Sequence, residues 1–130
     1  MGGGSAGLHS ALRSLCPGAP DYLLLELDPG LAAAKPRGVD AVVADARRPP
    51  LRRVEAVAVL HDSLHHIPGW RRVLHEMLEP YSCVVVSDYD PGTIPGRILS
   101  LLERLAGFPA EFTPPDELAA LLEANAIPPP

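Results

Sequence analysis

Short, continuous apolar runs alternate along the chain with segments in which apolar residues recur at helical spacing. Four of the runs, at residues 22–27, 39–44, 54–60 and 83–88, are rich in leucine or in β-branched residues. Runs of this length that are bounded by turn-forming residues are typical of strands buried in a parallel sheet. The pattern therefore predicts four strands of a mainly parallel sheet.

Helical segments lie before, between and after these runs. They are expected at residues 5–16, 30–34, 68–78, 94–105 and from 113 onwards. Ser5 and Thr113 are the expected N-caps of the first and last helices, and Pro114 and Pro115 would occupy the first turn of the last one. Trp70 and the leucines of the last two helices are expected to belong to the core. Strands that alternate with helices predict an α/β fold with a Rossmann-like sheet and helices on both faces.

Size and charge narrow the class of protein. The chain has 130 residues, of which 47% are hydrophobic, and this suits a single compact domain over residues 1–130. Its net charge of −5, without a continuous basic cluster, argues against nucleic acid as a partner. No apolar stretch approaches the ~20 residues that cross a bilayer, so we expect no membrane association and a cytoplasmic protein. Cys16 and Cys83 have no partner at metal-binding spacing and are expected to be small buried hydrophobic residues.

Residues suited to ligand binding follow the predicted strands. A glycine-rich turn at residues 2–7 runs into the first helix, Glu26 ends the first strand, and Asp45-Ala46, His61-Asp62 and Asp88 come at the ends of the next three. Glycine lets the backbone approach a ligand closely, and an acid about twenty residues further on can accept hydrogen bonds from a ribose diol. Because the carboxyl ends of parallel strands share one edge of the sheet, we expect these five segments to converge on one crevice.

Four stretches carry a resemblance to a known family. They are residues 2–7, 25–29, 43–47 and, above all, the Leu-His-His-Ile-Pro-Gly-Trp segment that begins residues 64–74. In the order and spacing of these stretches the chain resembles a class I S-adenosylmethionine-dependent methyltransferase of the branch that includes the ubiquinone and menaquinone biosynthesis enzymes. The resemblance covers almost the whole chain. It implies S-adenosylmethionine as the cofactor, a small-molecule acceptor, and methyl transfer by alignment of donor and acceptor.

The resemblance also implies roles for single residues in the first half of the site. Gly2, Gly4 and Ala6 would form the turn against the methionine and ribose portion of the cofactor. Glu26 would hold the ribose hydroxyls, and Leu27 would lie along the adenine.

In the second half of the implied site, Asp45 and the Ala46 amide would read the adenine edge. Leu60 and His61 would lie nearest the sulfonium, and His61 is the implied general base for a hydroxyl or acidic-carbon acceptor. The segment after Leu60 lacks the Asn/Asp-Pro-Pro-aromatic signature of nitrogen methylation, which favours oxygen or carbon acceptors. Residues between Asp88 and Thr113 would cover the acceptor.

Several of these features have plainer explanations that the sequence leaves open. Residues 2–7 could also form a flexible tail, and Glu26 could be a solvated carboxylate at a strand end. Asp45 could form an Asx turn that folds the segment after it. The whole chain would also suit a catalytically inactive methyltransferase-like binding or partner subunit. A nicotinamide-dependent (NAD) oxidoreductase uses a similar sheet, although residues 45–46 and the Leu-His-His segment argue against it.

A metal site is considered because imidazoles and a carboxylate cluster in the sequence at His61, Asp62, His65 and His66. Their spacing matches no named zinc pattern, so we predict no metal ligands. In the family that the chain resembles, the Leu-His-His segment is a structural loop whose imidazoles bond to nearby backbone, and the same role is expected here.

The chain departs from the family pattern at both ends. Family members have a strand ahead of the glycine turn and two strands after the last helix, and the sequence shows neither, which predicts a truncated methyltransferase fold. Without the first strand, the strands that end at Glu26 and His61 either pair directly or leave a gap. The missing last pair would expose a sheet edge at residues 83–86, which favours association with another chain. A truncated gene model, a deliberate fragment and a homo-oligomer that completes its sheet between chains would each fit the sequence.

Overall fold

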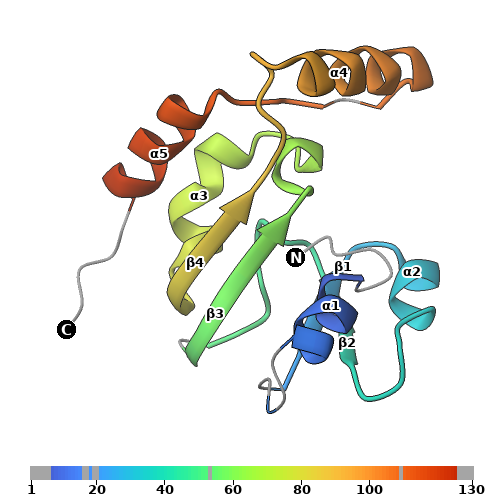
Figure 1. Cartoon of the computed structure of the whole chain (residues 1–130). Helices are drawn as coiled ribbons and strands as arrows, with labels where there is room; N and C mark the ends of the chain where they lie inside the picture. The colour runs from blue at the N-terminus through green and yellow to red at the C-terminus, as the bar shows by residue number, and fades with distance from the viewer. Residues whose placement is uncertain (1–6, 16–17, 19–20, 53, 109, 126–130) are drawn as a thin grey trace.

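The computed structural model describes residues 7–15, 18, 21–52, 54–108 and 110–125 of the chain. In chain order the elements are α1 (Gly7–Leu15), β1 (Leu23–Glu26), α2 (Pro29–Ala33), β2 (Asp40–Val43), β3 (Val54–His61), the 3-10 helix η1 (Leu64–His66), α3 (Trp70–Leu78), β4 (Tyr81–Ser87), α4 (Ile94–Ala106) and α5 (Pro115–Ala124). Strands and helices alternate through most of the chain (Figure 1). The predicted α/β, Rossmann-like class is confirmed, and each predicted element is found with ends shifted by a few residues.

The strands form two parallel pairs. β1 pairs with β2, with Leu24 opposite Ala41, and β3 pairs with β4, with Leu60 opposite Val86. Within the described ranges, no strand hydrogen bond joins one pair to the other. Of the two arrangements that the sequence left open, the structure therefore has the gap.

The first pair carries a turn that determines where β1 ends. Leu24 and Leu25 are successive residues that point to opposite sides of the strand, and both are buried, as expected for a strand covered on both faces. Asp28 caps α2, because its Oδ1 accepts hydrogen bonds from the N–H groups of Gly30 at 2.6 Å and Leu31 at 3.2 Å. The tight cap fixes the backbone immediately after Glu26.

The second pair rests on the main hydrophobic core. The buried members of this core are Leu60, Leu64, Trp70, Leu74, Met77 and Leu78, and α5 packs its leucines against them. Trp70 has no exposed surface, which confirms its predicted place in the core. The other face of this sheet is less covered, since Val57 and Val85 are about half exposed.

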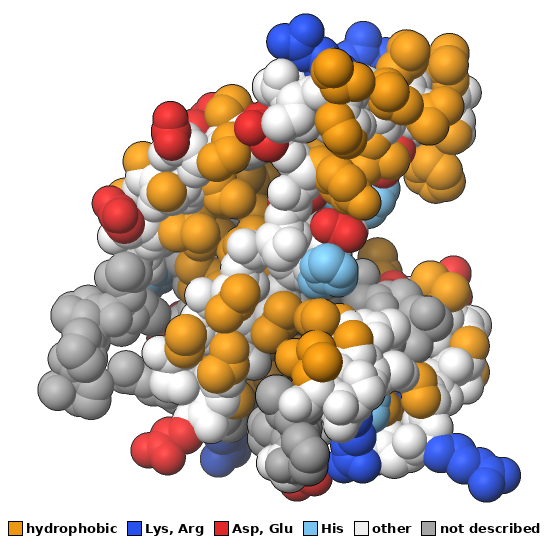
Figure 2. Space-filling model, in the orientation of Figure 1, with side chains coloured by type: hydrophobic (Ala, Val, Ile, Leu, Met, Phe, Trp, Pro, Cys, Tyr) orange, Lys and Arg blue, Asp and Glu red, His pale blue; other side chains and the backbone are white. Residues whose placement is uncertain are grey.

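The prediction that the leucines of α4 belong to the core is wrong for Leu101, Leu102 and Leu105. Ile94, Ile98, Leu101, Leu102 and Leu105 are each more than half exposed, and Figure 2 shows hydrophobic side chains gathered over this helix. Helical periodicity identifies an apolar face, but it does not tell whether another element covers that face. In the part of the chain that the structure describes, no helix is both long and apolar enough to cross a bilayer.

Two further predictions are wrong. Thr113 does not cap α5, because Pro114 occupies the N-cap position and the Thr113 hydroxyl instead accepts a hydrogen bond from Arg71 Nη2 at 2.6 Å. The Thr113 hydroxyl oxygen thus bonds to the Arg71 guanidinium on α3 and does not cap α5. Cys83 is exposed and not buried, because it lies two residues before Val85 and shares its uncovered face of β4. Cys16 lies outside the described residues.

Candidate functional site

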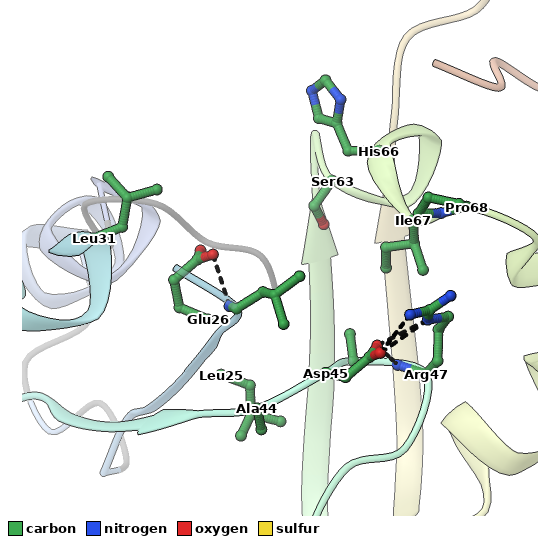
Figure 3. A pocket seen from close by; sticks show the side chains of 12 residues that line it. Leu25, Glu26, Leu31, Ala44, Asp45, Arg47, Ser63, His66, Ile67 and Pro68 are labelled. Atoms are coloured by element: carbon green, nitrogen blue, oxygen red, sulfur yellow. Dashed lines mark hydrogen bonds and ion pairs between the residues drawn. The ribbon is translucent and has the colours of Figure 1, made fainter. Parts of the chain in front are cut away.

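A cavity of 310 Å³ lies where β1, β2 and β3 end. It is lined by Leu25, Glu26, Leu27, Leu31, Ala44, Asp45, Ala46, Arg47, Ser63, His66, Ile67 and Pro68. Figure 3 shows that these side chains come from both strand pairs: Leu25, Glu26 and Leu31 lie on one side, and Asp45 and Arg47 after β2 lie on the side of Ser63, Ile67 and Pro68. The volume is at the lower end of the roughly 300–1,000 Å³ typical of small-molecule sites, and the position is the one expected for ligands of parallel sheets.

Glu26 is the last residue of β1 and presents a carboxylate at the wall of the cavity. It is only 7% exposed, and its Oε1 accepts hydrogen bonds from the N–H groups of Leu27 at 2.8 Å and Asp28 at 3.1 Å. Because the capped turn before α2 fixes both N–H groups, the carboxylate is held in one orientation before any ligand arrives. The arrangement can present a carboxylate oxygen to a pair of hydroxyl groups.

Asp45 follows β2 and is engaged by Arg47. Its Oδ1 accepts from the Arg47 N–H at 2.9 Å, Nε donates to both carboxylate oxygens at 3.0 Å, and Nη2 donates to Oδ2 at 2.6 Å. The side-chain hydrogen bond from Arg47 lowers the pKa of Asp45 below its ordinary value, and Asp45 in turn raises the pKa of Arg47. The Asx turn that the sequence left open is therefore present. Three N–H groups of Arg47 thus occupy most of the about four lone-pair sites of the carboxylate, so a ligand that bonds to Asp45 competes with Arg47.

Ser63 reaches the cavity through a constrained turn after β3. Asp62 has a φ of 45°, in the left-handed region, and its N–H donates to the Ser87 carbonyl at 2.8 Å. Ser63 is 2% exposed, and its Oγ has no hydrogen-bond partner among the described residues. A buried hydroxyl without a partner is costly. A polar ligand group in the cavity would satisfy it.

The cavity brings together some of the residues that the sequence singled out. Those that line it are Glu26, Leu27, Asp45 and Ala46. Gly2, Gly4 and Ala6 fall outside the described residues, so their role stays a prediction.

The two residues expected nearest the sulfonium are not in the cavity lining. Leu60 is 1% exposed and belongs to the core beneath α3. The His61 side chain is 48% exposed, with its Nε2 3.5 Å from Asp62 Oδ2. The segment after β3 meets the cavity a few residues later, through Ser63 and Ile67.

Asp88 is turned away from the cavity, which corrects the expectation that all five segments converge there. Its Oδ1 bonds to the ring Nδ1 of His65 and accepts from the Tyr89 N–H at 2.9 Å, while its Oδ2 accepts from the His65 N–H at 3.1 Å. Burial alone would raise the pKa of Asp88, but the hydrogen bonds from His65 and Tyr89 outweigh burial and lower it. The His65 imidazole thus binds a carboxylate and not the nearby backbone.

Sequence reasoning missed three polar members of the cavity wall, namely Arg47, Ser63 and His66. Ser63 carried a usable signal, because it comes two residues after a strand end. Arg47 was visible only as part of a basic turn. The sequence predicts that His66 belongs to a structural loop, whereas in the structure its side chain is 44% exposed and lines the cavity.

Comparison with known proteins gives structural neighbours only. No protein-family model and no curated protein matches the sequence. A Thermotoga maritima protein described as an S-adenosylmethionine-dependent methyltransferase, possibly a histamine N-methyltransferase, superimposes with a TM-score of 0.79 at 19% identity, over 96% of this chain and 60% of that chain. A putative methyltransferase from an antibiotic biosynthesis pathway of Anabaena variabilis gives a TM-score of 0.66 at 19% identity, over 96% and 52%. The chain thus has the Rossmann-like fold of methyltransferases and spans little more than half the length of these neighbours.

Proposed function

We propose that the chain binds S-adenosylmethionine in this cavity and forms the cofactor-binding part of a methyltransferase that acts on a small molecule. The observation that carries the proposal is the buried Glu26 carboxylate at the end of β1, fixed by two backbone N–H groups. In Rossmann-like folds an acid at this place receives the ribose hydroxyls. Both solved neighbours are described as methyltransferases, which supports the choice of reaction.

The remaining lining residues suit the rest of a nucleoside. Leu27 and Ile67 offer apolar surface to a base, the Ala46 turn lines the same cavity, and the Ser63 hydroxyl is available for a polar atom. The cofactor, when bound, supplies a methyl carbon already activated by its sulfonium. The residues of the chain then have to hold and orient the nucleoside and exclude water.

His61 is proposed as the general base, since its exposed imidazole can take a proton from an acceptor while Asp62 faces its Nε2. An oxygen or carbon acceptor belongs to the same proposal, because the segment after Leu60 lacks the Asn/Asp-Pro-Pro-aromatic signature of nitrogen methylation. Membership of the ubiquinone and menaquinone branch belongs to it on the strength of residues 64–74. The description of the Thermotoga neighbour makes nitrogen the competing acceptor. Transfer of a labelled methyl group to a catechol or to histamine tests the acceptor class.

Calorimetric titration with S-adenosylhomocysteine tests the proposed cofactor site. Glu26→Gln keeps an acceptor for the Leu27 and Asp28 N–H groups but removes the charge that the ribose diol would meet. Since hydrogen bonds to charged groups contribute about 1.5–3 kcal/mol, we expect this variant to bind about ten- to a hundredfold more weakly. Asp40→Asn is the matched control, because Asp40 is an exposed acid at the opposite end of β2, and its affinity should equal that of the wild type.

The outcomes separate the alternative functions. No binding heat for the wild type would reject the cofactor proposal and favour an inactive binding or partner subunit. A change in NADH fluorescence on mixing would favour the oxidoreductase. Equal affinity of wild type and Glu26→Gln would remove Glu26 from the site while leaving cofactor binding in place.

A homo-oligomer through residues 83–86 is part of the proposal. Within the described ranges β4 pairs with β3 alone, which leaves its other edge available for a strand from a second copy. Sedimentation at increasing concentration should show association, and proline at Val85 should abolish it.

A further inference from the structure

Two histidines and a glutamate from distant parts of the chain meet beyond the ends of β3 and β4. His65 and His66 belong to η1, and Glu103 lies in the last turns of α4. One ligand atom from each of the three side chains lies within 4.8 Å of the other two. We propose that His65, His66 and Glu103 bind a divalent transition-metal cation of the zinc class.

The spacing of the donor atoms suits one ion. Glu103 Oε1 lies 3.5 Å from His65 Nε2 and 3.4 Å from His66 Nε2. For metal–ligand bonds of about 2.1 Å, tetrahedral geometry places neighbouring ligand atoms about 3.4 Å apart. Both carboxylate–imidazole distances therefore match neighbouring ligands of one ion. The two imidazole nitrogens lie within 4.8 Å of each other, and rotation of the exposed His66 side chain can bring them to the same spacing.

His65 is held in the orientation that a metal ligand needs. Its ring contacts the ring of His66, with centroids 4.0 Å apart, and stacks on the ring of Phe112, with centroids 4.3 Å apart. Its Nδ1 bonds to Asp88, whose carboxylate is itself fixed by the N–H groups of His65 and Tyr89. A carboxylate on one ring nitrogen directs the lone pair of the other nitrogen toward a metal. The Nε2 of His65 then faces Glu103.

Glu103 supplies a second, independent indication. Its side chain is 12% exposed, and its Oε2 is buried without a hydrogen-bond partner among the described residues. A buried carboxylate oxygen that lacks a donor is unfavourable, and a cation beside it removes the cost. With Asp88 behind His65, two carboxylates would balance the two charges of the ion.

The donor set favours zinc over magnesium or calcium. Two imidazoles and one carboxylate are typical of catalytic zinc sites, which keep a fourth position open, whereas magnesium and calcium take oxygen ligands. His66 also lines the cavity, so the proposed ion would lie next to the proposed cofactor site. The ion proposal nevertheless stands apart from the cofactor proposal, because zinc binding is measured without any nucleoside.

The test is calorimetric titration of zinc chloride into the full chain after treatment with a chelator. We expect one ion per chain and no comparable heat with magnesium chloride. His66→Ala and Glu103→Gln should each weaken zinc binding by at least ~10-fold, since even groups behind the ligands are worth 10- to 100-fold. Both residues lie outside the main hydrophobic core, so circular dichroism should show that both variants fold.

Neighbouring residues on α3 provide matched controls. His75→Ala and Glu76→Gln change an exposed imidazole and an exposed carboxylate away from the cluster, and zinc affinity should be unchanged. If the two histidines and Glu103 form only an ion-pair cluster, titration with zinc will release no binding heat. That result would overturn the proposal. Zinc binding that persists in both His66→Ala and Glu103→Gln would overturn it as well.

Discussion

Replacing Arg47 tests how the cavity uses Asp45. In the structure Arg47 donates to both oxygens of Asp45, so a cofactor that bonds to Asp45 has to compete with this side chain. The two side chains are 42% and 36% exposed, and exposed ion pairs contribute about 0.2–1 kcal/mol. Without Arg47 that cost disappears. We therefore expect Arg47→Ala to bind S-adenosylhomocysteine about 1.4- to 5-fold more tightly.

Calorimetric titration measures this change, and a double variant isolates its cause. In an Asp45→Asn background the gain from Arg47→Ala should vanish, because a neutral amide at this position would no longer hold the guanidinium with an ion pair. Arg52→Ala is the control, since Arg52 is an exposed arginine of the same connection that does not line the cavity. Weaker binding by Arg47→Ala would show that the guanidinium itself contacts the ligand, and our reasoning about competition would then be refuted.

The other predictions concern a hydroxyl, a pH dependence and the core. Ser63→Ala should bind S-adenosylhomocysteine about two- to tenfold more weakly, from a hydrogen bond worth roughly 0.5–1.5 kcal/mol, while unaltered affinity would place the hydroxyl outside the site. Because Arg47 lowers the pKa of Asp45, the ion pair stabilises the fold above the ordinary pKa of Asp45, and this contribution is lost as the pH falls through the lowered pKa. The stability of Arg47→Ala should therefore fall less steeply with pH in this range. Identical acid-unfolding curves for the variant and the wild type would contradict this prediction. Trp70→Ala should lose about 3–5 kcal/mol in urea unfolding, whereas Tyr89→Ala, at an exposed position, should stay within about 0.5 kcal/mol; equal losses would contradict the assigned core.

The order of elements and one wall of the cavity could be predicted from the sequence because they depend on local patterns. A continuous apolar run predicts Leu24 and Leu25 on opposite buried faces, and the acid that follows them has to lie at the carboxyl end of the strand. Asp28-Pro29 is a local helix start, so the turn behind Glu26 was also accessible. These features need only residues a few positions apart.

The remaining features depend on contacts between distant segments, which a single sequence does not encode in its periodicity. Glu103 looked like an ordinary polar residue of an amphipathic helix, yet it lies beside His65 and His66. Thr113 has the pattern of a helix cap, but Arg71 from α3 takes its hydroxyl. In both cases a charged group from another element decides the role of the side chain.

Asp45 and Asp88 show why the same pattern gave two different outcomes. Each is an acid that follows a parallel strand, and the strand pattern placed both backbones correctly. Arg47, two residues away, holds Asp45 at the cavity wall, whereas the imidazole of His65 binds Asp88, which does not line the cavity. The strand fixes where a carboxylate is attached, and the nearest strong donor fixes where it points and how much of its charge a ligand meets. For that reason changing the donor Arg47, and not the acid alone, distinguishes a ligand-binding Asp45 from a turn-forming one.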